Sequence, residues 1–172
     1  MSELDVISDT TFAEQAAQAV DALVKDHDLC PVKRAQISGL RQIAVNQFGQ
    51  VKDFAKKQQK RAEKRIENGG RNPSTKILAE IEFWKRVVSL CDGKPPRCTW
   101  SLQMEAEAAL PDELRDEPVP KGTQLTKEQQ NQRRVTKEKN RQWMLDWKER
   151  HYPAFFQRFC AHYLYCLGKQ GN

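Results

Sequence analysis

The chain has 172 residues, of which 38% are apolar and 30% are charged. This length suits a single helical domain over residues 1–172, with a thin core and helices that carry broad polar faces. The formal net charge of +6 favours a polyanionic partner. No apolar run approaches the length of a membrane span, so we expect no membrane partner.

The N-terminus and the cysteines predict a cytoplasmic protein. The opening stretch "MSELDVISDTTF" is acidic and lacks the apolar run of a signal peptide. The five cysteines are odd in number and have no framework spacing, which is typical of reduced thiols in the cytosol.

Charge is distributed in alternating blocks along the chain. Residues 1–32 hold seven acidic groups and one basic group, whereas residues 33–71 hold eleven basic and three acidic groups. Residues 105–120 have a net charge of −5, and residues 121–150 hold nine basic and four acidic groups. These blocks predict a polarised surface with separate acidic and basic faces.

The first predicted helix begins at a capping box formed by Thr11 and Glu14 and ends near Asp28. A second, long apolar stripe runs from Ile37 to Ile66 and predicts a helix of about 30 residues. Within it, two glycines weaken the helix locally and allow a kink or a break, and "NGGRNP" ends it. The glycines are Gly39 and Gly49.

A third helix is predicted after Asn72-Pro73, with Ser74 as its N-cap. Its expected buried side consists of Ile77, Leu78, Ile81, Trp84, Val88 and Cys91. The stretch "TWSLQMEAEAAL" predicts a short fourth helix that carries Trp100 and Met104.

Residues 111–124 contain three prolines, one glycine and several acidic groups, which predicts an acidic, mobile, Pro-rich loop within the domain. A further helix begins at Thr126, where Gln129 completes a capping box, and is expected to end at Tyr152-Pro153. A strongly apolar helix then closes the chain, with Gly168 as its C-cap. Because no strand-like alternation occurs, the predicted fold is all-α, a bundle of about five to six helices with one long basic helix.

The long second helix carries its basic residues in two rows. One row steps by four residues, the second lies beside it, and an arginine from an earlier turn continues toward them. These residues are Lys52, Lys56, Lys60 and Lys64; Lys57, Arg61 and Arg65; and Arg41. Like charges at this spacing repel one another, so an external polyanion would stabilise the helix. A solvated helix that pairs with the acidic N-terminal helix is the alternative.

A second basic segment precedes the closing helix. It interleaves Arg133, Arg134, Lys137, Arg141 and Lys148 with Gln and Asn side chains, which suit contacts to phosphate and sugar without reading sequence. Trp143 and Trp147 would be able to stack on bases, although such a pair is more often part of a core.

We expect no catalytic residue, no metal site and no cofactor. The sequence holds no phosphate-binding or zinc-protease motif, and no nucleophile motif surrounds the three histidines, His27, His151 and His162. Glu105 and Glu107 would face different sides of a helix. A possible zinc set lacks Cys-x-x-Cys spacing: Cys91, Cys98, Cys160, His162 and Cys166. The protein is therefore not expected to be an enzyme.

Two stretches, "KRAQISGLRQIAVNQF" and "FFQRFCAHYLYCL", resemble parts of the small subunits of type III CRISPR effector complexes. "KRAQISGLRQIAVNQF" is similar to a helix of these subunits that carries an Arg, matched here by Arg41, and "FFQRFCAHYLYCL" is similar to their closing helix, with Arg158 in its basic slot. Both stretches together cover about 30 of the 172 residues. The chain departs from this pattern by its length, its charged second helix and its acidic loop.

The resemblance implies a non-catalytic, all-α subunit of a crRNA-guided ribonucleoprotein complex. Such subunits stack in several copies, contact other subunits, and hold the guide–target duplex or a displaced strand through a basic face. RNA is the favoured partner and single-stranded DNA the alternative. Two other functions stay open: a protein–protein scaffold that binds an acidic partner, and a helix-turn-helix DNA-binding regulator that would begin at "RAQISGLRQIAVNQ".

Overall fold

The computed structural model describes residues 3–27, 30–69, 74–116 and 118–169. In these residues the chain forms α-helices and two short 3-10 turns, and no strand, so the predicted all-α fold is confirmed. The elements are α1 (Glu3–His27), α2 (Arg34–Asn46), η1 (Phe48–Gln50), α3 (Val51–Gly69), α4 (Thr75–Asp92), α5 (Leu102–Ala109), η2 (Asp112–Leu114) and α6 (Lys127–Lys169).

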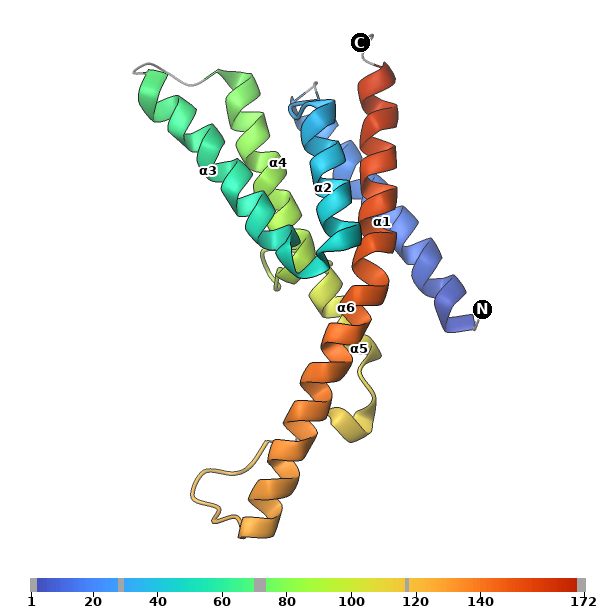
Figure 1. Cartoon of the computed structure of the whole chain (residues 1–172), viewed down its shortest axis with the longest axis vertical. Helices are drawn as coiled ribbons and strands as arrows, with labels where there is room; N and C mark the ends of the chain where they lie inside the picture. The colour runs from blue at the N-terminus through green and yellow to red at the C-terminus, as the bar shows by residue number, and fades with distance from the viewer. Residues whose placement is uncertain (1–2, 28–29, 70–73, 117, 170–172) are drawn as a thin grey trace.

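The bundle is built from α1, α2, α4 and the C-terminal half of α6 (Figure 1). Helix α3 lies on the outer side of α4 and forms a helical hairpin with it, whereas the first half of α6 extends away from the bundle. Aromatic rings fill the core. The largest fully buried side chains include Trp84, Tyr163, Phe12, Phe83, Phe155, Phe156 and Phe159.

Hydroxyl side chains cap the N-termini of three helices. Ser74 accepts a hydrogen bond from the amide of Ile77 at 3.3 Å, and Ser101 does the same for the amide of Met104 at 3.1 Å. At the start of α6, the backbone amide of Thr126 donates to Oε1 of Gln129 at 3.0 Å, and the backbone amide of Gln129 donates to Oγ1 of Thr126 at 3.1 Å. The predicted caps at Ser74 and Thr126 are confirmed.

The predicted start of the first helix is wrong. Helix α1 already begins at Glu3, so Thr11 and Glu14 lie inside it. Residues three apart share one side of a helix, and this spacing alone therefore does not separate a capping box from a helix interior. The predicted end near Asp28 agrees with the observed last residue, His27.

The single long helix predicted over residues 37–66 is also wrong, because the chain leaves helical geometry at Gln47, with φ −144° and ψ 60°. The segment is divided into α2, of 13 residues, and α3, of 19 residues. Gly39 stays helical and serves close packing, since a Cβ there would lie 3.2 Å from Cζ of Phe54. The break at Gln47 lets α3 fold back against α2 and α4.

The longest helix is instead α6, with 43 residues. We predicted that Tyr152-Pro153 would end a helix there, and this prediction is wrong because Pro153 lies inside α6. An interior proline costs about 3 kcal/mol. Buried rings on both sides of it, Trp147 and Phe155, anchor both segments in the same core and offset this cost. Gly168 is likewise within the helix and not a C-cap.

The apolar stripes predicted most of the core and missed some positions. Leu78 and Val135 are each 45% exposed, although both were expected on apolar sides. Trp100 lies before α5 and not within it. In the described part of the chain, no helix has both the length and the apolar character that a membrane span requires.

Candidate nucleic-acid interface

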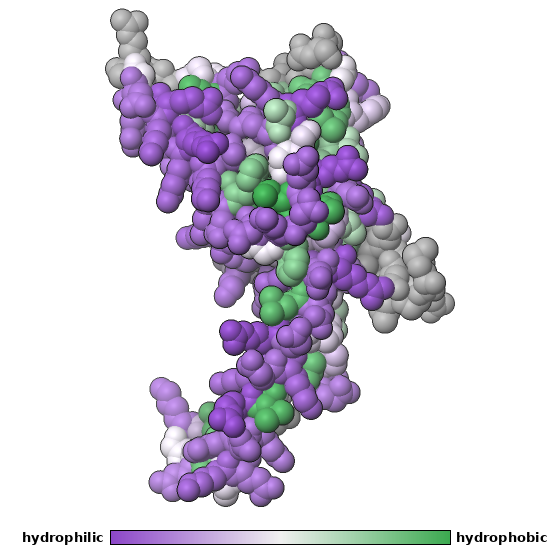
Figure 2. Space-filling view, viewed as in Figure 1, coloured by the Kyte–Doolittle hydropathy of each residue, from purple (hydrophilic) through white to green (hydrophobic). Residues whose placement is uncertain are grey.

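Small buried residues hold α3 against the bundle. Val51, Ala55 and Ala62 are fully buried along one side of the helix. Because alanine side chains are short, α3 packs closely on α4, and the ring of Phe54 meets the ring of Trp84 edge-on at 5.8 Å. The opposite side of α3 is covered by hydrophilic side chains, at the upper left of Figure 2.

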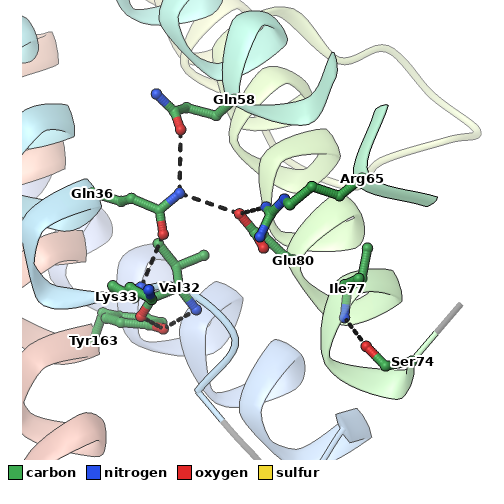
Figure 3. Close-up of polar contacts among 9 residues, drawn as sticks. All are labelled: Val32, Lys33, Gln36, Gln58, Arg65, Ser74, Ile77, Glu80 and Tyr163. Carbon is green, nitrogen blue, oxygen red and sulfur yellow. Dashed lines mark hydrogen bonds and ion pairs between the residues drawn. The ribbon is translucent and has the colours of Figure 1, made fainter. Parts of the chain in front are cut away.

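A buried carboxylate connects α2, α3 and α4. Glu80 is 5% exposed, and its Oε1 accepts hydrogen bonds from Arg65 Nη2 at 2.7 Å and from Gln36 Nε2 at 3.2 Å (Figure 3). The amide of Gln36 also donates to Oε1 of Gln58 at 3.2 Å. A buried carboxylate needs such partners for its charge, so Arg65 is a structural residue of the bundle.

A second ion pair joins the start of α3 to the end of α4. The Lys52 ammonium group contacts Oδ2 of Asp92, and this hydrogen bond is the main cause of the raised pKa of Lys52. Both side chains are 40% exposed, and a pair of this kind contributes about 0–1 kcal/mol. Lys52 and Arg65, both predicted to bind phosphate, therefore have partners inside the protein.

The other five predicted cations of α3 form its outer basic row, which is defined as Lys56, Lys57, Lys60, Arg61 and Lys64. All five side chains are exposed, and none forms an ion pair with another described residue. From first to last, the row extends about 12 Å along the helix axis. The structure thus brings these five charges together on one rigid, solvent-facing surface.

The first half of α6, residues 127–150, carries the second group of predicted cations, and four of these have partners inside the protein. Asp116 of the acidic loop lies 3.4 Å from Arg133 and 4.0 Å from Lys137. The loop is fastened further by Nδ2 of Asn140, which donates to the carbonyl of Leu114 at 3.0 Å. The acidic loop therefore neutralises part of the basic surface of α6.

The next turns of this segment show the same pattern of local pairing. Arg141 forms an ion pair of 3.7 Å with Glu138, and Arg134 donates to Oδ1 of Asn131 at 2.7 Å. Helix α6 does not pack against α3, and Figure 1 shows the two segments on separate parts of the molecule. The predicted basic residues thus occupy separate surfaces and do not merge into one.

The two arginines named by the family resemblance lie on other elements, Arg41 on α2 and Arg158 on the C-terminal half of α6. Arg41 is exposed and lines a shallow depression together with Gln157 of α6. Arg158 is half-buried, and its Nη1 donates to the carbonyl of Ala154 at 2.9 Å. Neither arginine extends the outer basic row of α3.

The tryptophans considered for base stacking are not displayed together. Trp147 is 8% exposed and belongs to the core, where its ring lies 6.3 Å from that of Phe12. Trp143 is half-buried and packs against the same core. Base stacking on a Trp143–Trp147 pair is therefore excluded by the burial of Trp147.

The acidic and imidazole groups weighed for catalysis have structural partners. Glu105 accepts from Trp100 Nε1 at 2.9 Å, and Glu107 accepts from Gln103 at 3.1 Å. The ring of His151 lies 4.5 Å from that of Trp147. The side chain of His27 lies outside the described residues.

Two buried thiols are unsuited to act as nucleophiles. Burial raises the pKa of the Cys91 thiol and that of the Cys160 thiol to about 12, so both are protonated at neutral pH. The five cysteines, all of them described, are without disulfide bonds.

The structure brings together one group of possible metal ligands of which the sequence indicated only two. Asp21 of α1 lies beside His162 and Cys166 of α6, and the three potential ligand atoms are within 4.8 Å of one another. The spacing of His162 and Cys166, one helical turn apart, was a usable signal. No local pattern could have included Asp21, which is more than a hundred residues away in the chain.

Comparison of the chain with protein-family models, with curated proteins and with solved structures finds no match. Its function is therefore inferred from its own residues and their geometry.

Proposed function

We propose that the outer basic row of α3 binds the phosphate backbone of nucleic acid without sequence preference, with RNA favoured over single-stranded DNA. The observation that carries this proposal is the set of five exposed cations on one side of a rigid helix, without ion-pair partners among the described residues. Neighbouring cations at i,i+4 repel each other, and phosphate groups along the row relieve that repulsion.

The anchoring of α3 supports the same proposal. The Arg65–Glu80 and Lys52–Asp92 pairs hold both ends of the helix against α4. Binding then requires little ordering of the backbone, which lowers its entropic cost. If each of the five cations contacts one phosphate, the logarithm of the binding constant falls with that of salt concentration with a slope of about −3.5.

The setting that we propose is a cytoplasmic ribonucleoprotein assembly, as a non-catalytic small subunit of a crRNA-guided effector complex. This setting depends on the two resembling stretches around Arg41 and Arg158. In it, the row on α3 holds the guide–target duplex or a displaced strand, while the depression lined by Arg41 and Gln157 is available to other subunits or further copies.

A protein–protein scaffold is the second candidate, favoured by the projecting half of α6. Val135 and Leu145 are 45% and 46% exposed on this segment, and part of its charge is already neutralised by Asp116. Apolar side chains on an extended helix are suited to contacts with another protein. This function would use α6 and leave the outer basic row of α3 unexplained.

The test is a fluorescence-anisotropy titration of the full chain with a labelled single-stranded RNA of arbitrary sequence, at low and at moderate salt. The variant changes Lys56, Lys60 and Lys64 to Glu. A control with the same change in charge converts Lys121, Lys127 and Lys139, all exposed, to Glu. Circular dichroism checks that both variants are folded.

We expect the α3 variant to lose at least about 30-fold in affinity and the control to lose less than about threefold. Equal losses in both variants would show that net charge alone drives binding. No binding of the unchanged chain at low salt would contradict the proposal and favour the scaffold. Tighter binding to one duplex DNA sequence would favour the helix-turn-helix alternative, because α2, η1 and α3 already form two helices joined by a short turn.

A further inference from the structure

Asp21, His162 and Cys166 bring three different metal-ligating groups together where α1 packs on α6. Nε2 of His162 donates to Oδ1 of Asp21 at 2.7 Å, and Sγ of Cys166 lies 3.9 Å from the same oxygen. His162 and Cys166 are four residues apart, so they project from one side of a continuous helix. The cluster is therefore positioned by two helices whose packing is part of the core.

These donor atoms have the chemistry and the spacing of a zinc site. Zinc binds imidazole, thiolate and carboxylate ligands with bonds of about 2.0–2.3 Å, so the ligand atoms of a tetrahedral site lie about 3.3–3.8 Å apart. The separation of Cys166 from Asp21 is close to this range. The His162–Asp21 contact would have to open by less than about 1 Å, and the Asp21 side chain is 62% exposed and free to move outward.

The part of α6 that carries the cluster is held in place by its neighbours. The Tyr163 hydroxyl accepts a hydrogen bond from the amide of Val32 at 2.7 Å and donates one to the Val32 carbonyl at 2.5 Å. Tyr163 follows His162 directly, so these two hydrogen bonds fix α6 next to the cluster. Three protein ligands leave the fourth position of a tetrahedral ion to water.

We infer that Asp21, His162 and Cys166 form a binding site for a thiophilic divalent cation such as Zn²⁺, with water as the fourth ligand. The ion would join α1 to the last turns of α6, and it would leave the outer basic row of α3 untouched.

The site was not expected from the sequence, which lacks a Cys-x-x-Cys pair. His-x-x-x-Cys on one helix supplies two ligands, and the third, Asp21, comes from a distant helix. Sites assembled in this way depend on tertiary packing, and a search for local ligand spacing does not find them.

Titration of the reduced, untagged full chain with Co²⁺ tests the inference. Tetrahedral Co²⁺ bound to thiolate gives intense visible bands and a charge-transfer band in the near ultraviolet, and Zn²⁺ should displace it. We expect one ion per chain. Asp21→Asn, His162→Gln and Cys166→Ser should each weaken binding at least about tenfold. Cys166→Ser should also abolish the charge-transfer band, since it removes the one thiolate of the site.

Cys98→Ser is the matched control, because this buried thiol lies next to Gly93 at the end of α4 and outside the cluster. Its spectrum should equal that of the unchanged chain. A folded chain that gives no tetrahedral Co²⁺ spectrum would overturn the inference, as would bands that persist in Cys166→Ser. A thermal-shift measurement with Zn²⁺ checks each variant independently, with a rise in melting temperature expected only where the ligands are intact.

Discussion

Helix α3 and the first half of α6 have similar composition and opposite electrostatic arrangements. Both are helical, rich in Lys and Arg, and surrounded by Gln and Asn. Helix α3 directs two paired cations toward α4 and five cations without an ion-pair partner among the described residues outward. In α6, four cations are engaged by Asp116, Glu138 and Asn131: Arg133, Arg134, Lys137 and Arg141. The number of basic residues therefore does not define a binding surface. What defines it is where cations without an internal partner lie together.

The largest effect, on the free energy of unfolding, is expected where a basic residue of α3 has a structural role. Arg65→Ala leaves the carboxylate of Glu80 buried without its main partner, and we expect the free energy of unfolding to fall by about 2–3 kcal/mol. Arg61→Ala, one turn away on the outer row, should change it by less than about 0.5 kcal/mol. Urea unfolding measures both, and equal effects would remove the distinction between anchoring and outer cations.

The next effect concerns the salt dependence of RNA binding. Changing Lys56, Lys60 and Lys64 to Gln should make the slope of log K against log salt concentration shallower by about 2, because three phosphate contacts are lost. The matched change of Arg133, Lys137 and Arg141 to Gln should alter it by less than about 0.7. Anisotropy titrations at four salt concentrations give both slopes. A larger change from the α6 variant would reverse the roles of the two helices.

The smallest effect, on RNA affinity, is expected when two cations of α6 lose their acidic partner. Asp116→Ala removes the carboxylate that lies near Arg133 and Lys137. If pairing with this loop is what keeps α6 from binding, RNA affinity should rise by about two- to fivefold at low salt. Asp112→Ala, in the same loop and paired with Arg115, is the control and should leave affinity within about twofold. An unchanged affinity in Asp116→Ala would mean that geometry, and not charge pairing, separates α6 from α3.

Some features of the protein were available from local sequence patterns alone. These features are the all-α fold, the caps at Ser74 and Thr126, and the aromatic side of the closing helix. They depend on residues three or four apart, whose relative positions on a helix are the same in any packing. The exposure of the outer basic row could also be predicted, because it lies opposite the buried side of Ala55 and Ala62.

Other features were decided by contacts between segments far apart in the chain. The break at Gln47 and the continuity of α6 through Pro153 depend on which buried side chains the two adjoining segments share, and local propensity does not contain that information. Likewise, only the packed structure shows that Glu80 engages Arg65, that Asp116 engages Arg133, and that Asp21 meets His162. The sequence by itself determined that the chain is helical and the sign of the charge on each segment. The tertiary structure decided which charges face a partner inside the protein, because burial and distance set the energy of each pair.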